Sequence, residues 1–267
     1  MSGRLTDAER AAASLTTPTT GLICDGRRIP CAGEIVTWLD DPKRAPTVAD
    51  GAPRDADDVL AFMWHTSKGR TTTTLSPTAI PSTMAETLAR YMARTARDVS
   101  VHLWIDTDAT VIQQADLATR TTWHAGWVNG WTVGAELVQR EDAPTTLTVP
   151  QIRAAADVTD ATCDALGIPR RVLVGPDGAP WVRPVRDLMS PRAKHFQTGA
   201  NLGGRGKTWE GVIGHCHVAH PDAGANGKRG GRGPGDPGPL IFAELISRGY
   251  ARHVVDAEGR IAREPLA

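Results

Sequence analysis

The order of apolar and polar residues predicts a central set of β-strands. From Val59 the run VLAFMWHTS is apolar over the length of one strand, as in strands that are buried on both faces, and it ends at His65. The runs SVHLWID and TVIQQAD lie on either side of residues 107–109 and predict a hairpin. WTVGAELVQ and WEGVIGHCHV predict two more strands, and we expect the second to deliver His215 to a loop.

Three helices are predicted between and after these strands. The first begins at Pro81 and Ser82 and repeats apolar residues at helical spacing, namely Met84, Leu88, Tyr91 and Met92. The second lies in TVPQIRAAADVTDATCDALG and the third in GPLIFAELISRGY, each with a proline in the first turn and a glycine at the end. Strands and helices alternate except at the hairpin. The fold class is therefore α/β, a mixed central sheet flanked by helices.

The N-terminal part predicts a small β-rich extension of this domain. GLICDGRRIPCAGEIVTWL contains two short strand-like runs around Asp25 and Gly26, and a third that ends at Leu39, which predicts a β-meander. The Pro- and Asp-rich stretch that follows predicts a connector. We divide the chain into an extension over residues 1–57, a main domain over 58–250 and a C-terminal tail over 251–267.

Composition and charge narrow the choice of partners. The chain has 267 residues, 40% of them hydrophobic, which is enough for one full core. Its 30 basic and 30 acidic side chains cancel, which argues against nucleic acid as a partner even though GKRGGRG is locally basic. No apolar run reaches the roughly 18 residues of a membrane span, and the N-terminus lacks the apolar core of a signal peptide. We expect a monomer made in the cytoplasm.

The four cysteines are too few and too scattered for a disulfide framework in a chain of this length. Cys24 and Cys31 flank a predicted turn and could pair across a hairpin, although a reducing cytoplasm disfavours the bond. This pairing stays open.

Two histidines lie at the ends of predicted strands. His65 ends the first apolar run and His215 follows the last. Side chains from distant parts of a chain converge at strand ends, and catalytic zinc takes three protein ligands from His, Asp, Glu or Cys. A single histidine at such a place is more often structural, so neither residue alone indicates a metal site.

Five stretches in order are more specific: MWHTS, HLWID, WHAGWVNGWTVGAELV, GVIGHCHV and DPGP. This series resembles the zinc-dependent N-acetylmuramoyl-L-alanine amidases of the type-2 amidase family, which includes the peptidoglycan recognition proteins. The resemblance covers about residues 58–250, and its most specific parts are WHAG before VGAEL, and GH before DPGP. It implies a mixed sheet flanked by helices, with zinc in a groove that binds the glycan–peptide junction of peptidoglycan.

The resemblance also implies roles for single residues. His65, His215 and Asp236 would be the zinc ligands, and Glu136 of VGAEL would be the catalytic acidic residue that passes the proton of the attacking water to the leaving amine. His124 of WHAG matches a residue that forms the groove. We expect Trp123, Trp127 and Asn129 to line the groove with it, and core packing is the alternative for the tryptophans.

Two departures from the family pattern leave alternatives open. The family carries Lys or Arg two residues before the aspartate of DPG, where a cation stabilises the oxyanion, but this chain has Pro234 there. Arg232, or else Lys228 or Arg229, would have to replace it. The 21 positions from His215 to Asp236 also exceed the usual span, so His217, His220 and Asp222 compete for the third ligand position, or the third ligand is absent.

The leading hypothesis is a zinc amidase that cleaves the bond between N-acetylmuramic acid and L-alanine, released onto the cell wall by lysis, as an endolysin is, or by a secretion machine. A cytosolic amidase that recycles muropeptides is the nearest alternative. A peptidoglycan-binding protein without hydrolase activity is the alternative from another class.

Overall fold

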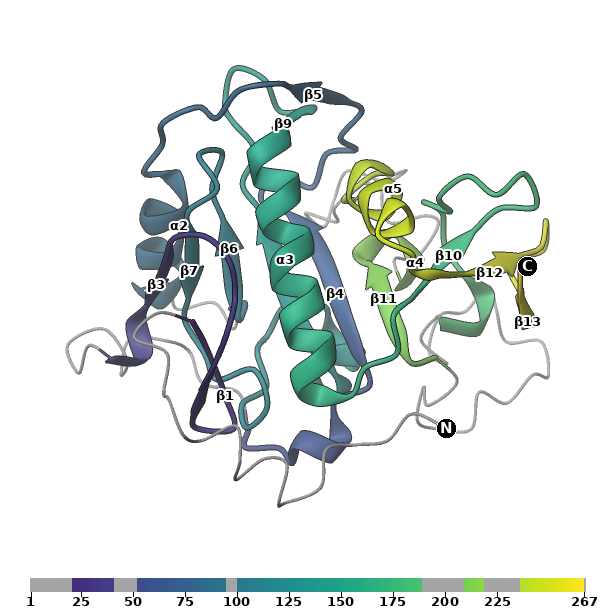
Figure 1. Ribbon diagram of the computed structural model, residues 1–267, viewed down its shortest axis with the longest axis horizontal. Helices are drawn as coiled ribbons and strands as arrows, with labels where there is room; N and C mark the ends of the chain where they lie inside the picture. The colour runs from purple at the N-terminus through teal and green to yellow at the C-terminus, as the bar shows by residue number, and fades with distance from the viewer. Residues whose placement is uncertain (1–20, 41–51, 95–99, 189–208, 219–235, 267) are drawn as a thin grey trace.

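A six-stranded mixed sheet is the centre of the computed structural model, which describes residues 21–40, 52–94, 100–188, 209–218 and 236–266 (Figure 1). The strand order is β11-β4-β8-β6-β7-β3. Strands β11, β4, β8 and β6 are parallel, β7 is antiparallel to β6, and β3 is parallel to β7. The bounds are β3 Ile35–Thr37, β4 Ala61–Thr66, β6 Leu103–Ile105, β7 Val111–Gln113, β8 Thr132–Leu137 and β11 Gly211–Gly214. The mixed sheet and the β6–β7 hairpin are confirmed.

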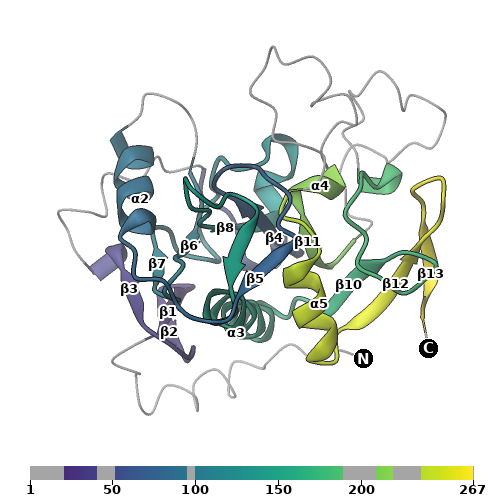
Figure 2. The same cartoon turned by 90° about the horizontal axis from the view of Figure 1, so that it is seen from above.

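Helices cover both faces of this sheet. The bounds are α2 Met84–Arg94, α3 Val149–Leu166, α4 His215–Val218 and α5 Leu240–Ser247. Seen from above, α3 and α5 lie on one side and α2 on the other (Figure 2). Helix α3 begins with a capping box between Thr148 and Gln151 and ends at Gly167 in the left-handed conformation, which confirms the predicted stop.

The two faces of the sheet have different environments. In β4, Phe62 and Trp64 pack into the core cluster that contains α3, whereas Ala61 and Met63 pack into a second cluster on the opposite side. Because side chains alternate along a strand, His65 points to the face away from α3. The same alternation in β8 places Glu136 on that face.

Three smaller sheets surround the central one. They are the antiparallel pair β1 (Leu22–Cys24) and β2 (Arg27–Ile29), the parallel pair β5 (Thr74–Ser76) and β9 (Thr146–Thr148), and the sheet β10 (Arg171–Val174), β12 (Ala251–Val255) and β13 (Ile261–Leu266). The predicted meander is wrong in its third strand. Strand β3 extends the central sheet beside β7 because it pairs there instead of with β2. Residues 251–266, predicted to be a tail, form β12 and β13.

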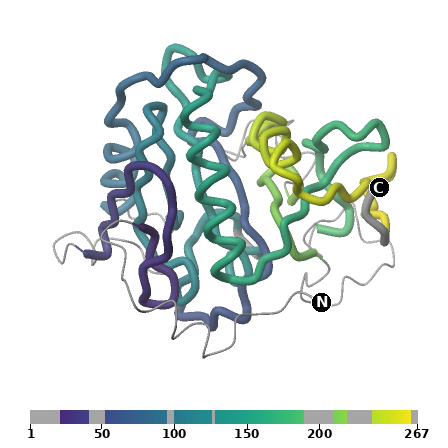
Figure 3. The backbone as a smooth tube through the Cα atoms, in the orientation of Figure 1, coloured from purple at the N-terminus to yellow at the C-terminus, as the bar shows by residue number. Residues whose placement is uncertain are grey.

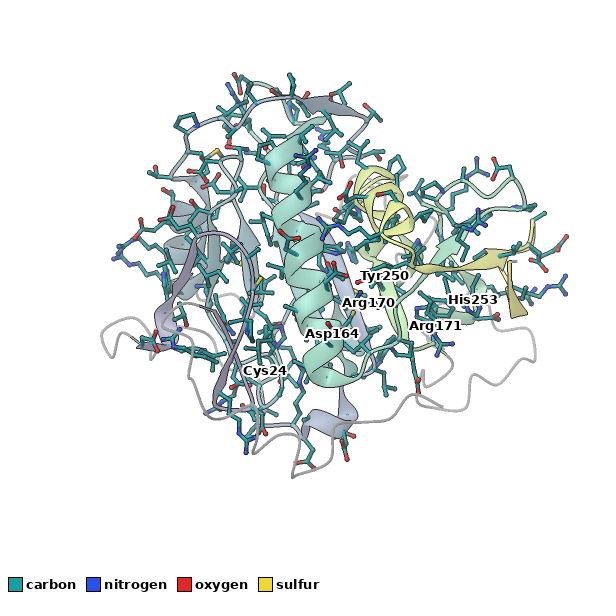
Figure 4. The ribbon with its side chains drawn as sticks, in the orientation of Figure 1. Cys24, Asp164, Arg170, Arg171, Tyr250 and His253 are labelled. Atoms are coloured by element: carbon teal, nitrogen blue, oxygen red, sulfur yellow. The ribbon has the colours of Figure 1, made fainter. Side chains whose placement is uncertain are left out.

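The N-terminal hairpin and the C-terminal sheet both pack onto α3. Leu22 and Cys24 of β1 belong to the same core cluster as α3, and the tube in Figure 3 shows this segment beside the helix. In the C-terminal half of α3, Asp160 accepts from the Tyr250 hydroxyl, and Arg170 lies over the Tyr250 ring (Figure 4). Both terminal parts therefore share one core with the central sheet.

The buried face of α2, the cysteines and the lengths of the helices also bear on the sequence predictions. Tyr91, placed on the apolar face of α2 by spacing, is 58% exposed, and the helix instead buries Ala85 and Ala89. All four cysteines are free, so Cys24 and Cys31 do not pair. Among the described residues, no helix has the length and apolar character needed to cross a membrane.

Candidate metal centre

His65 and His215 are brought together by neighbouring parallel strands. Trp64 of β4 is in register with Gly214 of β11, so the next residue of each strand lies at the same edge of the sheet. The two imidazole rings are 4.9 Å apart between centroids. The expectation of a loop at His215 is wrong, because His215 is the first residue of the short helix α4.

Asp236 completes a group of three. One ligand atom each from His65, His215 and Asp236 can be chosen so that all lie within 4.8 Å of one another. The carboxylate is fully buried, and its Oδ1 accepts hydrogen bonds from Thr66 N at 2.6 Å and Thr66 Oγ1 at 2.5 Å. Its Oδ2 lies 3.5 Å from His215 Nδ1. The backbone oxygen of Asp236 accepts from Cys216 N at 2.7 Å, so the chain returns to this site after the long interval.

His217, a competing ligand in the sequence analysis, points elsewhere. Its Nδ1 accepts from Gly214 N at 3.0 Å and its Nε2 lies 2.7 Å from the Trp181 carbonyl. Burial lowers the pKa of His217 to about 4, so the ring is neutral. On a continuing strand His217 would point the same way as His215, but both residues lie in the helix α4, where side chains two positions apart diverge. The other competitors, His220 and Asp222, lie outside the described residues.

Glu136 lies beside the histidine of β4. It is directly across from His65 in the register of β4 and β8, on the same face of the sheet, and it is 1% exposed. A buried carboxyl group next to a group of metal-ligand type is a common arrangement for acid–base catalysis. Its assignment as the catalytic acidic residue remains a prediction.

His124 reaches the same face from the loop before β8. Its Nδ1 lies 3.0 Å from His65 Nε2, and its Nε2 lies 3.1 Å from Thr132 Oγ1. The Oδ1 atom of Asn129 accepts the backbone amides of His124 at 3.2 Å and Ala125 at 2.7 Å. Both the backbone and the ring of His124 are therefore fixed by neighbours.

Gly134 makes room for the His124 ring. A Cβ at position 134 would lie 2.4 Å from His124 Cγ, which is closer than real Cβ contacts allow. Thr132, Gly134 and Glu136 alternate along β8 and so share one face. Thr132 and Gly134 were not predicted from the sequence, although this two-residue period before Glu136 was a signal that could have revealed them.

Arg54 and His102 form hydrogen bonds with the backbone of the segment before β8 and of β8 itself. Arg54 donates to the carbonyl oxygens of Leu117, Ala118, Asn129 and Thr132, at distances from 2.7 to 3.3 Å. His102 is fully buried, and its Nδ1 accepts from Gly134 N at 3.0 Å. Burial and then the charge of Arg54 hold the pKa of His102 well below its usual value, so this ring is neutral.

The predicted groove residues have different surroundings. Trp123 is 45% exposed next to His124, and its role in substrate binding remains a prediction. Asn129 is buried, and its oxygen is used by the two amides of its own loop. The side chain of Trp127 and the whole of Arg232 lie outside the described residues.

The donor set fits a catalytic zinc ion. Two imidazoles and one carboxylate are typical ligands of a site that keeps a fourth position open. His215 Nδ1 makes no hydrogen bond within the described part of the chain, although the atom is buried. A buried polar atom without such a bond is costly unless it binds another group, and a metal ion between His215 and Asp236 would satisfy it.

Comparisons with known proteins identify the family of the chain. A family model described as N-acetylmuramoyl-L-alanine amidase matches residues 56–228, so Asp236 lies beyond the matched segment. A comparison with curated proteins found no matching sequence.

Several solved structures are similar at low identity. PGRP-LB of Drosophila is 16% identical over 82% of this chain and 96% of its own, with a TM-score of 0.41. The amidase LysC of Clostridium intestinale URNW is 11% identical over 81% of this chain and 97% of its own, with a TM-score of 0.39. The hydrolase AmiA of Staphylococcus aureus is 17% identical over 57% of this chain and 64% of its own, with a TM-score of 0.34. Since the family match alone spans well over half of the residues, the chain belongs to the N-acetylmuramoyl-L-alanine amidase family.

Proposed function

We propose that this protein is a zinc-dependent hydrolase that cleaves the amide bond between N-acetylmuramic acid and L-alanine in peptidoglycan. The observation that carries the proposal is the position of His65, His215 and Asp236. One ligand atom of each lies within 4.8 Å of the other two, although the residues come from three separate parts of the chain. The buried carboxyl group of Glu136 beside His65 adds the acid–base residue that amide hydrolysis needs.

His65, His215 and Asp236 would hold the ion, and Thr66 fixes the aspartate through two hydrogen bonds to its Oδ1. When bound, zinc polarises the scissile carbonyl and lowers the pKa of a water molecule. Two neutral imidazoles and one carboxylate leave a net positive charge on the loaded site, which favours the developing oxyanion.

Glu136 would take the proton of the attacking water on a carboxylate oxygen and pass it to the nitrogen of L-alanine as the C–N bond breaks. Burial on the site face of β8 keeps the carboxylate close to His65 and away from bulk solvent. The exposed face of Trp123 would contact the sugar or the stem peptide. The cation that replaces the family residue at Pro234 is proposed to be Arg232.

The test combines metal analysis with product analysis. Purified protein is assayed for zinc by mass spectrometry and for release of L-alanine N-termini from cell-wall sacculi. We expect one zinc per chain and turnover in the wild type, loss of zinc in Asp236→Ala, and retained zinc with roughly 10²–10⁴-fold slower turnover in Glu136→Gln. Glu258→Gln changes an exposed carboxylate in the β12–β13 connection and serves as the matched control.

The same assay separates the other candidate functions. A wild-type protein that holds zinc and binds sacculi but releases no L-alanine would refute the hydrolase and identify a recognition protein. Turnover of soluble anhydro-muropeptides without turnover of intact sacculi would indicate a recycling enzyme instead of a lytic one.

A further inference from the structure

A chain of hydrogen bonds leads from the backbone of the loop before β8 to the ligand His65. It runs from the Val128 carbonyl to Thr132 Oγ1 at 2.9 Å, from Thr132 Oγ1 to His124 Nε2 at 3.1 Å, and from His124 Nδ1 to His65 Nε2 at 3.0 Å. We propose that Thr132 sets the tautomers of both histidines through this chain, and so selects Nδ1 of His65 as its metal-binding atom. The inference rests on the proposed zinc function.

The first step follows from the chemistry of a carbonyl and a hydroxyl. A carbonyl oxygen only accepts, so the bond between Val128 O and Thr132 requires the single hydroxyl proton of Thr132. The oxygen of Thr132 is then an acceptor toward His124, and the proton between them belongs to His124 Nε2. Thr132 and Val128 are fully buried, so the hydroxyl proton has no bulk water to turn to.

The second step determines which ring nitrogen of His65 carries the proton. A neutral imidazole carries one proton, so His124 Nδ1 is bare when Nε2 is protonated. In the hydrogen bond between the two rings, His65 Nε2 must then donate its proton to His124 Nδ1. Nδ1 of His65 is left with its lone pair, and that is the form in which an imidazole nitrogen binds zinc.

Side-chain hydrogen bonds hold the segment that starts the chain of bonds, which includes the 3-10 helix Gly126–Trp131. Arg54 donates to the carbonyl oxygens of Asn129 at 3.3 Å and Thr132 at 2.7 Å, next to the Val128 carbonyl. Asn129 Oδ1 accepts hydrogen bonds from the backbone amides of His124 and Ala125, which fixes the backbone that carries the His124 ring. Gly134 leaves the space in which the ring lies. The bonds therefore connect groups whose positions are set independently of the metal.

Thr132 and His124 are positioning residues in this scheme, since neither is one of the three ligands. Partners of this kind orient a metal-binding histidine and fix its tautomer, and removing one typically weakens metal binding by roughly 10–100-fold. The opposite assignment, with the Thr132 proton donated to His124, would put protons on Nδ1 of both histidines and block the metal-binding atom of His65.

The test compares Thr132→Val, which keeps the shape but removes the hydroxyl, with Thr132→Ser, which keeps the hydroxyl. Zinc affinity is measured by chelator competition. Histidine tautomers are read from long-range ¹H–¹⁵N spectra of the metal-free protein at pH 8, with His65→Gln and His124→Gln used for assignment. We expect an Nε2 proton on both His65 and His124 in the wild type, zinc affinity roughly 10–100-fold lower in Thr132→Val, and recovery in Thr132→Ser.

The outcomes distinguish this inference from the proposed function. An Nδ1 proton on His65 in the metal-free wild type, or equal zinc affinity in the two Thr132 variants, overturns the tautomer scheme while the zinc enzyme stands. A wild type that binds no zinc refutes the proposed function, and the tautomers are still read directly. If Thr132→Val does not fold, the wild-type spectrum alone decides.

Discussion

Replacing Gly134 by alanine tests whether the His124 ring is locked against β8. The added Cβ would lie 2.4 Å from His124 Cγ and 2.6 Å from both Cδ2 and Nδ1. To regain ordinary van der Waals contact the ring must move back by about 1 Å. Rotation of the ring about the Cβ–Cγ bond of His124 leaves Cγ where it is, so this rotation does not relieve the contact. The whole side chain must shift.

The cost of this shift has two parts. Overpacking of a filled site costs about 1–3 kcal/mol. A displacement of about 1 Å also breaks the bonds of His124 to His65 and Thr132, each of which contributes about 1 kcal/mol. We expect Gly134→Ala to lower the free energy of unfolding by about 3–5 kcal/mol in total.

Urea unfolding of the metal-free protein, followed by circular dichroism, measures this change directly. Gly130→Ala is the matched control, because a Cβ at Gly130 would meet no atom within 4 Å, and we expect it to change the free energy by less than about 0.5 kcal/mol. A loss below about 0.5 kcal/mol in Gly134→Ala would show that the His124 ring moves freely and would refute the reasoning.

Three further predictions concern Thr66, His102 and the cap of α3. Thr66→Val removes the hydroxyl bond to Asp236 Oδ1 and should weaken zinc binding roughly tenfold in chelator competition, whereas Thr66→Ser should not; equal affinities would contradict the role of the hydroxyl. Because burial holds the pKa of His102 below its ordinary value of 6.5, the unfolded chain takes up a proton below that pH that the folded chain refuses. This contribution to stability is full above pH 6.5 and is lost as the pH falls, with a slope approaching about 1.4 kcal/mol per pH unit, and urea unfolding between pH 7.5 and 5 should show a steeper slope for the wild type than for His102→Gln. Thr148→Ala removes the cap of α3 and should cost about 1 kcal/mol in urea unfolding, with Thr148→Ser close to the wild type; a cap without effect would give equal values for both.

The central strands and the two histidines were predictable because local patterns report them. A buried parallel strand is a continuous apolar run, so β4 and the position of His65 at its end could be predicted from the sequence. Gly167 ends α3 where a left-handed residue is needed, and that signal is also local.

The remaining features depend on long-range contacts. Thr66 and Asp236 are 170 residues apart, and nothing in the composition between them indicates that they bond. The third N-terminal run has the same strand character whether it pairs with β2 or with β7, so its place in the sheet could not be predicted. Tyr91 fits the helical period of α2 but lies beyond the width of the face that α2 buries against β6 and β7.

Asp236 is held in place by hydrogen bonds to its own neighbours, whatever the length of the chain that leads to it from His215. Its side chain is bonded to Thr66, its carbonyl is bonded to Cys216, and the next carbonyl, of Pro237, accepts from Thr72 N at 3.2 Å. The carboxylate is thus fixed to β4 and α4 by its own short neighbourhood. Its position therefore depends on bonds to Thr66, Thr72 and Cys216 and not on the number of residues between His215 and Asp236. We therefore expect the bonds of Asp236, and with them the proposed metal site, to tolerate a change in that number.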